Sequence, residues 1–313
     1  MLQGIQAGKY DEMLVKLYGQ EALTAQKQRY SQAVKKFATL YPEREDMEVF
    51  SAPGRTEVCG NHTDHQHGKV LAAAINLDAV AVVGFHEDGV IRLHSEGYPA
   101  ITVELSDLAI NEAEHGTTKA LIRGMAAQFA DKGVKIGGFD AYVTSDVLGG
   151  SGLSSSAAFE VLIGTILDIH YNKGAVGAVD IAKMGQFAEN KYFGKNCGLM
   201  DQMVSSVGGF VFIDFADPTK PVIDKHVCDF AAAGISLCIT DTKGSHADLT
   251  ADYVSIPVEM KSVAAHFGKE VLLNMIINKR RFSFFYFTNI FFILLSYSSK
   301  LSVGYKPKFL IYS

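Results

Sequence analysis

The chain of 313 residues is long enough for two domains, each with its own hydrophobic core. Its net charge of −5, without a basic stripe interleaved with aromatic residues, argues against non-specific nucleic-acid binding. The N-terminus lacks the basic-then-apolar order of a signal peptide, and the 4 cysteines contain no C-x-x-C pair. We therefore expect a cytoplasmic protein that binds neither nucleic acid nor a membrane.

Hydrophobic periodicity predicts helices and strands that follow one another without regular βαβ alternation, so the expected fold class is α+β. Helices are expected at two places within residues 11–40, and at 117–131, 157–169, 181–192 and 247–267, the last broken by Pro257. Strands are expected at 49–52, 70–85, 90–95, 139–146, 209–215 and 234–240. The turn at residues 87–89 predicts that the second and third of these strands form a hairpin.

The most informative segment is the glycine- and serine-rich stretch at residues 148–158, between an expected strand and an apolar helix. Its backbone N–H groups, its hydroxyls and the positive end of the helix dipole favour an anion, above all a phosphate. A Walker A loop would need a lysine here, a dinucleotide fingerprint would need glycine at Ser155, and a nucleophile elbow would need glycine at Leu153. For this loop alone, a serine-rich helix start without a ligand remains open.

The C-terminal segment breaks the composition of the chain. All 34 Asp and Glu residues precede Asn274, and from there Phe, Ile, Tyr, Ser and Lys dominate. We therefore expect residues 274–313 to be an aberrant or read-through tail, with a change of frame or gene boundary near Leu273. A membrane anchor at residues 282–297 is the alternative, although this run is shorter than the ~20 apolar residues of a spanning helix and holds Thr-Asn at its centre.

Three ordered motifs point to one family. The loop GSGLSSSA (Gly150–Ala157) resembles the ATP-phosphate loop of the GHMP small-molecule kinases. APGRTEVCGNHTDH (Ala52–His65) resembles the sugar signature of the galactokinase branch, and ENKYFGKNCGLMDQ (Glu189–Gln202) is similar to a further galactokinase motif. A weaker fourth match comprises Asp241-Thr, His246, Tyr253 and Glu259. Together they cover roughly residues 48–272.

The resemblance implies a fold and a division into domains. It implies a GHMP kinase N-terminal domain, ribosomal S5 domain 2-like, over residues 1–230, and the start of a ferredoxin-like C-terminal domain over 231–273. The family normally carries a third, glycine-rich motif in that second domain, and nothing after Leu272 matches it. We therefore expect an incomplete C-terminal domain and impaired activity.

The resemblance also implies a chemistry: ATP-dependent phosphorylation of a hexose, first of all galactose to galactose 1-phosphate, with Mg²⁺. Asp201 takes the position of the proton acceptor and Arg55 that of the transition-state stabiliser. The expected magnesium ligands are Ser156 and Glu189. ATP contacts are expected at Ser95, Gly150, Ser151, Gly152, Leu153, Ser154, Ser155 and Ser156. Sugar contacts are expected at Asn61, His62, Thr63, Asp64 and Tyr253.

Three departures from the sugar signature leave alternatives open. Glu57 stands where the family has asparagine, Asn61 replaces its acidic sugar ligand, and His65 replaces its tyrosine. A related hexose or an amino-sugar therefore remains open as the substrate, as does a sugar- and ATP-binding regulatory protein without catalysis. The spacing of His62, His65, His67 and Asp64 would also permit a zinc site.

Overall fold

The structure is a computed structural model that describes residues 1–228, 236–239, 250–272 and 308–311. The chain divides into two compact units. The first unit comprises residues 1–56 and 72–209, and the second comprises 57–71 together with the described residues from 210 onward.

The helices are α1 (Leu2–Gln6), α2 (Asp11–Tyr18), α3 (Leu23–Leu40), α4 (Thr118–Asp131), α5 (Ser155–Asn172), α6 (Ala178–Phe187), α7 (Met200–Val207) and α8 (Thr250–His266). Short 3₁₀ turns are η1 (Gln20–Ala22), η2 (Thr63–Gln66) and η3 (Glu112–Glu114), and η4 (Ala188–Phe193) is a π-helical turn. The strands are β1 (Glu48–Cys59), β2 (Lys69–His86), β3 (Val90–Ser95), β4 (Ile101–Glu104), β5 (Gly138–Ser145), β6 (Phe210–Asp214), β7 (Val222–His226), β8 (Ser236–Ile239) and β9 (Lys308–Ile311).

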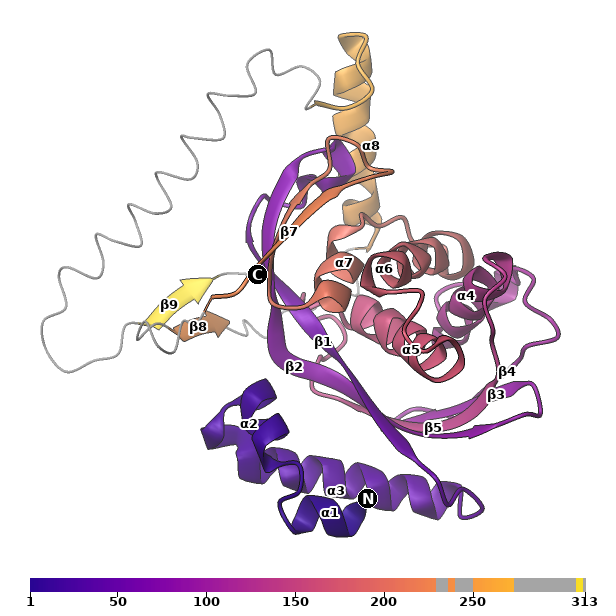
Figure 1. Cartoon of the computed structure of the whole chain (residues 1–313). Helices are drawn as coiled ribbons and strands as arrows, with labels where there is room; N and C mark the ends of the chain where they lie inside the picture. The colour runs from indigo at the N-terminus through magenta and orange to yellow at the C-terminus, as the bar shows by residue number, and fades with distance from the viewer. Residues whose placement is uncertain (229–235, 240–249, 273–307, 312–313) are drawn as a thin grey trace, which may run out of the picture. The chain divides into compact units, whose positions relative to one another are not determined.

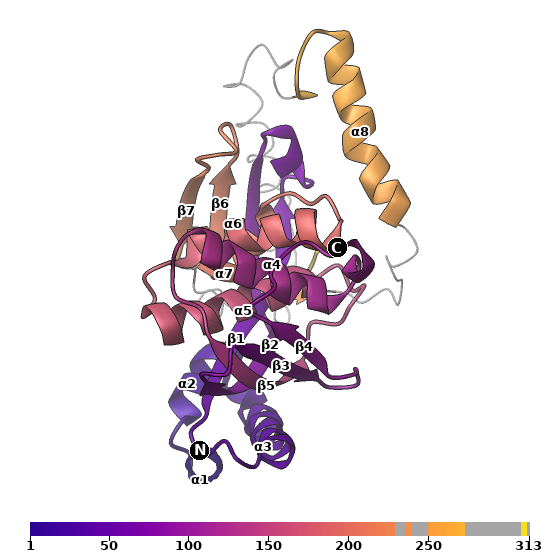
Figure 2. The ribbon, with the colours of Figure 1, turned by 90° about the vertical axis from the view of Figure 1, so that its right-hand side faces the viewer.

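The first unit consists of three layers. Its sheet has the order β4-β3-β5-β2, with β1 pairing to β2. Helices α4–α7 lie on one face of this sheet and α1–α3 on the other (Figures 1 and 2). Because β5 is parallel to β3 but antiparallel to β2, the sheet is mixed, and the expected α+β class is confirmed.

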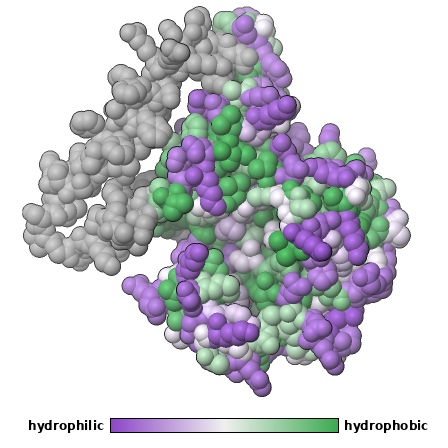
Figure 3. All heavy atoms as spheres, in the orientation of Figure 1, coloured by the Kyte–Doolittle hydropathy of each residue, from purple (hydrophilic) through white to green (hydrophobic). Residues whose placement is uncertain are grey.

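Strand β2 contributes side chains to the hydrophobic core on both faces of the sheet. Ala79, Ala81 and Val83 pack toward α4–α6, whereas Val80 and Val82 pack toward α1–α3. A strand buried on both faces reads as a continuous apolar run, which is why residues 79–83 contain no polar side chain. On the face of this unit seen in Figure 3, hydrophilic and hydrophobic residues are interspersed.

The expected hairpin of β2 and β3 is wrong. Strand β5 lies between them, with His86 of β2 opposite Gly138 and Ile91 of β3 opposite Phe139. A Cβ on Gly138 would lie 2.7 Å from the carbonyl oxygen of Val90 and 2.8 Å from the His86 ring. Glycine at this position therefore lets a distant strand enter beside a tight turn, so the local turn signal did not determine the pairing.

Three further expectations need correction. The short strand at 49–52 is the start of β1, which continues through the first half of the sugar signature to Cys59. The helix at 181–192 changes after Phe187 into the π-helical turn η4. Pro257 does not break α8 but lies inside it; a helix that is exposed along this stretch can leave the freed carbonyl to water.

The second unit contains the 3₁₀ turn η2 and strands β6 and β7, which pair antiparallel. The Phe215 N–H donates to the Gly68 carbonyl at 2.9 Å. Strand β8 pairs in parallel with β9, which belongs to the segment expected as a tail. The rest of that segment, including residues 282–297, lies outside the described residues, as do Asp241 and His246 of the weaker match. Among the helices that the structure describes, none is long and apolar enough to cross a membrane.

Candidate active site

The sugar signature and the phosphate loop meet inside the first unit at Gly54 of β1. The Arg55 N–H donates to the Leu153 carbonyl at 3.1 Å. A Cβ on Gly54 would lie 2.8 Å from that same carbonyl oxygen and 3.1 Å from the Val147 side chain. Glycine at this position is therefore what allows β1 to approach the loop closely.

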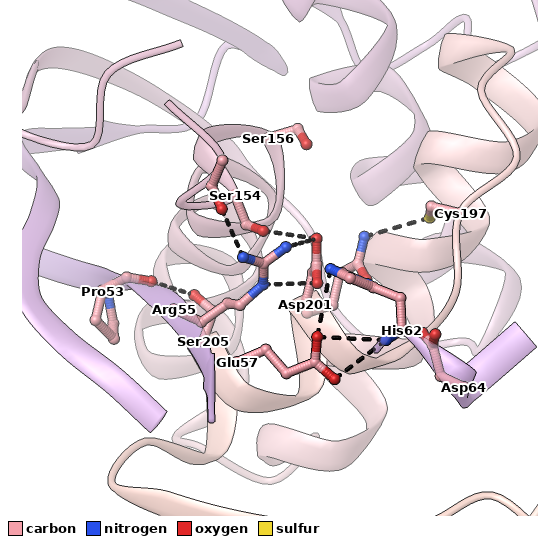
Figure 4. A network of polar contacts seen from close by, with 12 residues as sticks. Pro53, Arg55, Glu57, His62, Asp64, Ser154, Ser156, Cys197, Asp201 and Ser205 are labelled. Carbon is pink, nitrogen blue, oxygen red and sulfur yellow. Dashed lines mark hydrogen bonds and ion pairs between the residues drawn. The ribbon is translucent and has the colours of Figure 1, made fainter. Parts of the chain in front are cut away.

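Arg55 and Asp201 form a two-point ion pair beside the loop (Figure 4). Arg55 Nε lies 2.7 Å from Asp201 Oδ1, and Nη2 lies 2.8 Å from Oδ2. The third guanidinium nitrogen, Nη1, donates to the Gly152 carbonyl at 2.6 Å. The arginine side chain is only 8% exposed and the aspartate 28%. A fork of this kind fixes the orientation of the carboxylate and favours its ionised form.

Ser154 connects the phosphate loop to the same carboxylate. Its hydroxyl donates to Asp201 Oδ2 at 2.6 Å, as Figure 4 shows. Ser154 directly precedes α5 with a φ of 63°, after two left-handed glycines of the same loop, Gly150 at 75° and Gly152 at 76°. A left-handed serine is strained and persists where surrounding contacts hold it. The expected closeness of Asp201, Arg55 and the loop is confirmed.

The loop ends at the first turn of α5, a helix of 18 residues. The N–H groups of a first helical turn have no partner within the helix, so they and the helix dipole favour a phosphate at this point. The Ser151 hydroxyl donates to the Leu148 carbonyl of the same loop at 2.6 Å. Its hydroxyl therefore shapes the loop in this structure.

The two expected magnesium ligands lie together. Ser156 Oγ donates to Glu189 Oε1 at 3.0 Å, and Lys195 Nζ lies 3.0 Å from the same oxygen. Glu189 is 2% exposed and lies in η4, a π-helical turn of the kind often found at functional sites. A hydroxyl and a carboxylate are hard oxygen donors, and magnesium commonly takes one or two protein groups beside phosphate oxygens. The residues present therefore fit this ion.

Two buried side chains lie behind Glu189. The side-chain amide of Gln202 donates to Glu160 Oε2 at 3.0 Å and to Glu189 Oε2 at 2.8 Å. Burial, followed by the nearby Glu189 charge, raises the pKa of Glu160 well above its ordinary value. Burial would lower the pKa of Lys195, but the Glu189 carboxylate outweighs that effect and raises it.

The sugar-signature residues 61–64 belong to the second unit, where they form a tight turn whose first two residues, Asn61 and His62, are exposed. Asn61 and His62 have positive φ values of 54° and 51°. The Glu57 carboxylate accepts the His62 N–H at 3.1 Å, so this departure from the family pattern closes the turn. Thr63 begins the 3₁₀ turn η2, and Asp64 is buried within it.

The zinc alternative has no ligand set. Within the ranges that the structure describes, which include residues 61–67, no three His, Cys, Asp or Glu side chains are grouped so as to hold a metal. Two other expected contacts are placed by the backbone only. Ser95 is the last residue of β3, opposite Val143, and Tyr253 lies within α8.

Sequence reasoning missed Gly54, Glu160, Lys195 and Gln202. Lys195 and Gln202 lie inside the motif Glu189–Gln202, but the motif pattern alone gives neither residue a role. Glu160 carried a signal, because it follows Ser156 by four residues and so lies on the same face of α5. The signal for Gly54 was its place directly before Arg55.

Comparison with known proteins gives the family. The model of the galactokinase galactose-binding signature matches residues 35–85, and that of the GHMP kinase N-terminal domain matches residues 120–209. A galactokinase of Streptomyces coelicolor is 35% identical over 229 residues, 72% of this chain and 58% of that protein. A galactokinase of Lactiplantibacillus plantarum is 37% identical over 200 residues, 63% of this chain and 48% of that one.

The chain thus spans about half the length of the curated relatives it matches. Among solved structures, Lactococcus lactis galactokinase complexed with galactose is 28% identical, with a TM-score of 0.56 over 61% of this chain and 50% of that one. Methanococcus jannaschii mevalonate kinase shares the fold alone, at 19% identity and a TM-score of 0.50 over 60% of this chain and 58% of that one. With both family models matched in order, and with the site's residues on β1, the phosphate loop and α7, this chain belongs to the galactokinase branch of the GHMP kinases.

Proposed function

We propose that the protein transfers the γ-phosphoryl group of ATP to a hexose hydroxyl, with galactose as the first substrate and galactose 1-phosphate as the product. One observation carries the proposal: the Asp201 carboxylate is held by Arg55 and touches Ser154 of the phosphate loop. A carboxylate that can accept a proton therefore lies next to a cradle for phosphate, which is the pairing that phosphoryl transfer to an alcohol requires.

Residues 150–156 would hold the ATP phosphates, and Ser95 would contact the nucleotide. The first turn of α5 supplies N–H donors and the positive end of a dipole, so the phosphate charge is compensated without a P-loop lysine. Ser156 and Glu189 would hold Mg²⁺. When bound, this ion would offset the negative charge that develops on the transferring phosphoryl group.

Asp201 would accept the proton of the attacking sugar hydroxyl as the bond from that oxygen to the γ-phosphorus forms and the bond to the ADP oxygen breaks. Arg55 keeps Asp201 ionised and fixes both carboxylate oxygens, because its Nε and Nη2 each donate to one of them. In the same position its positive charge offsets the negative charge of the transferring group.

Asn61, His62, Thr63, Asp64 and Tyr253 would bind the sugar. Galactose is the ligand named for the Lactococcus lactis structure, and the galactose-binding signature covers residues 35–85 of this chain. Because Asn61 can donate as well as accept a hydrogen bond, where the family has an acidic residue, a related hexose or an amino-sugar is the second candidate substrate.

The test is product identification. The 313-residue chain is incubated with ATP, Mg²⁺ and each member of a panel of galactose, glucose, mannose, galactosamine and N-acetylgalactosamine. Phosphorus NMR then follows the appearance of ADP and of a sugar phosphate. A hexose 1-phosphate formed fastest from galactose supports the proposal. Binding of ATP and galactose by titration calorimetry, without any phosphorylated product across the panel, would favour a regulatory protein instead.

A further inference from the structure

Gln202 connects three elements of the first unit behind the proposed magnesium ligands. It lies on α7, Glu160 lies on α5 and Glu189 lies in η4. The relative exposure of Gln202 and Glu160 is 0% and that of Glu189 is 2%, so none of the three exchanges its hydrogen bonds freely with water. The amide nitrogen donates to one oxygen of each glutamate, at 3.0 Å and 2.8 Å. An amide carries two N–H donors; the two carboxyl oxygens are their shortest contacts, and the Cys197 sulfur is a longer third one at 3.6 Å.

The two carboxylate oxygens of Glu189 have different partners: one faces Gln202 and the other faces the phosphate loop. Oε2 accepts the N–H of Gln202 at 2.8 Å, while Oε1 accepts the Ser156 hydroxyl and lies 3.0 Å from the Lys195 ammonium. The amide therefore holds the carboxylate from behind and leaves Oε1 on the side of the phosphate loop. Without that donor, Oε2 would lose a buried hydrogen bond, and the side chain could rotate toward another donor such as the Cys197 thiol, which also contacts Glu189.

Close packing around Gln202 limits the positions that its side chain can take. A Cβ on Gly185 of α6 would lie 3.0 Å from Glu160 Oε2 and 3.1 Å from Gln202 Cγ. A glycine therefore closes the cluster from the α6 side, and there is little room for the amide to turn away from either glutamate.

We propose that Gln202 is a positioning residue for the reaction: anchored by Glu160, it holds Glu189 so that Oε1 faces Ser156, where the nucleotide-bound metal ion would bind. The inference rests on the proposed function and extends it to two residues that do not themselves touch substrate. Partners behind a metal ligand typically contribute 10- to 100-fold to metal affinity or activity. The competing account is a core hydrogen bond that stabilises the fold and has no effect on the metal.

The experiment separates these accounts by measuring metal affinity directly. Mn²⁺ replaces Mg²⁺ as a paramagnetic probe, and electron paramagnetic resonance measures free Mn²⁺ in titrations of the 313-residue chain with ADP present. Gln202→Leu keeps the volume and removes the amide. Gln202→Asn keeps the amide on a shorter side chain, for the case in which the leucine variant does not fold. Circular dichroism fixes a temperature at which each variant is folded.

We expect Gln202→Leu and Gln202→Asn to weaken Mn²⁺ binding about 10- to 100-fold, with ADP affinity in EDTA unchanged. Glu160→Gln, which keeps an acceptor oxygen for the Gln202 N–H, should stay within about threefold of the native affinity. Gln128→Leu removes an amide from α4, where its contact is Asp131 at 3.4 Å, and serves as the matched control.

Native Mn²⁺ affinity in a folded Gln202→Leu or Gln202→Asn variant, with only a lower melting temperature, would overturn the inference and leave the proposed function intact. A native chain that binds neither ADP nor the Mn²⁺–ADP complex would contradict the proposed function, and the inference with it.

Discussion

The phosphate loop and the sugar-signature turn both depend on left-handed backbone, but they are supported differently. In the phosphate loop, Ser154 at a φ of 63° is held by a hydrogen bond from its side chain to Asp201. In the signature turn, Asn61 and His62 at 54° and 51° are exposed; the Glu57 carboxylate accepts the His62 N–H and lies 3.9 Å from the Nε2 of the His62 ring. The backbone of the phosphate loop is therefore held by side chains that pack against it. In the signature turn, replacing one exposed side chain can alter the residues offered to a ligand without disturbing the packing.

The largest effect is expected on catalysis, from substitution of Arg55 beside the phosphate loop. Arg55→Lys keeps the charge but cannot reproduce the two-point contact with Asp201 and the third contact with the Gly152 carbonyl. Because a misplaced catalytic group can lose about 100-fold in rate, kcat/KM for galactose should fall by about that factor. Steady-state kinetics check this. The control is Arg92→Lys, on β3 away from the phosphate loop, where the arginine pairs with the exposed Asp88 and with the buried Asp140 of β5. Equal losses in both variants would remove the special role of Arg55.

The next largest effect is expected on stability, from substitution of Gly54, where β1 approaches the phosphate loop closely. Gly54→Ala places a Cβ 2.8 Å from the Leu153 carbonyl oxygen, a backbone atom that cannot move aside cheaply. We expect the free energy of unfolding in urea to fall by about 2 kcal/mol, as overpacking typically costs. A Cβ on Gly149 would meet nothing within 4 Å, so Gly149→Ala should change stability by less than about 0.5 kcal/mol. Equal stability of the two variants would contradict the packing argument.

In the exposed signature turn, we expect substitution of Asn61 to change the preference between hexoses. Asn61→Glu restores the acidic residue of the family signature in a turn that its own side chain does not hold together. A gained or mispaired sugar hydrogen bond is worth about 1–3 kcal/mol, so the ratio of kcat/KM between galactose and competing hexoses should move by about tenfold. The same hexose panel measures the ratio. A ratio that stays constant, with the absolute rates unchanged, would remove Asn61 from sugar recognition.

The smallest effect lies outside both regions, at the Glu114–Arg123 pair beside α4. Hydrogen bonds from Arg123 lower the pKa of Glu114 to about 2 from an ordinary 4.5. A carboxyl group with a depressed folded pKa stabilises the fold above about pH 4.5, and this stabilisation is lost as the pH falls toward 2. Glu114→Gln should remove about 1 kcal/mol or less of that pH dependence, because the pair is partly screened by solvent. Urea unfolding at pH 3 and pH 6 gives the comparison, and an unchanged pH slope would contradict it.

The sequence predicted what depends on local pattern. The loop between an apolar strand and an apolar helix is where it was expected, and the pairing of Asp201 with Arg55 followed from the family motifs. The hairpin of β2 and β3 was wrong because a strand about fifty residues away, β5, pairs with both. Local turn chemistry carries no information about such a partner.

The sequence also did not predict where two segments of the chain approach each other closely. Gly54 and Gly185 matter because of the backbone and side chains that face them in space, and no spacing rule identifies those neighbours. Glu160 could be placed on the same face of α5 as Ser156, but its contact with Gln202 joins two helices that are not consecutive in the chain. Roles that depend on such contacts become predictable only once the packing is known.

We propose above that Asp201, held by Arg55 at the phosphate loop, accepts the proton of the sugar hydroxyl. The most direct measurement compares the native chain with Asp201→Asn and with Asp217→Asn, an exposed aspartate that holds only its own turn. ADP release with galactose and Mg²⁺–ATP gives the rate, and titration calorimetry gives the ATP affinity. We expect Asp201→Asn to lower kcat by about 10²- to 10⁴-fold with ATP affinity retained, and Asp217→Asn to match the native chain. Turnover of Asp201→Asn within a few-fold of the native rate would contradict the proposal.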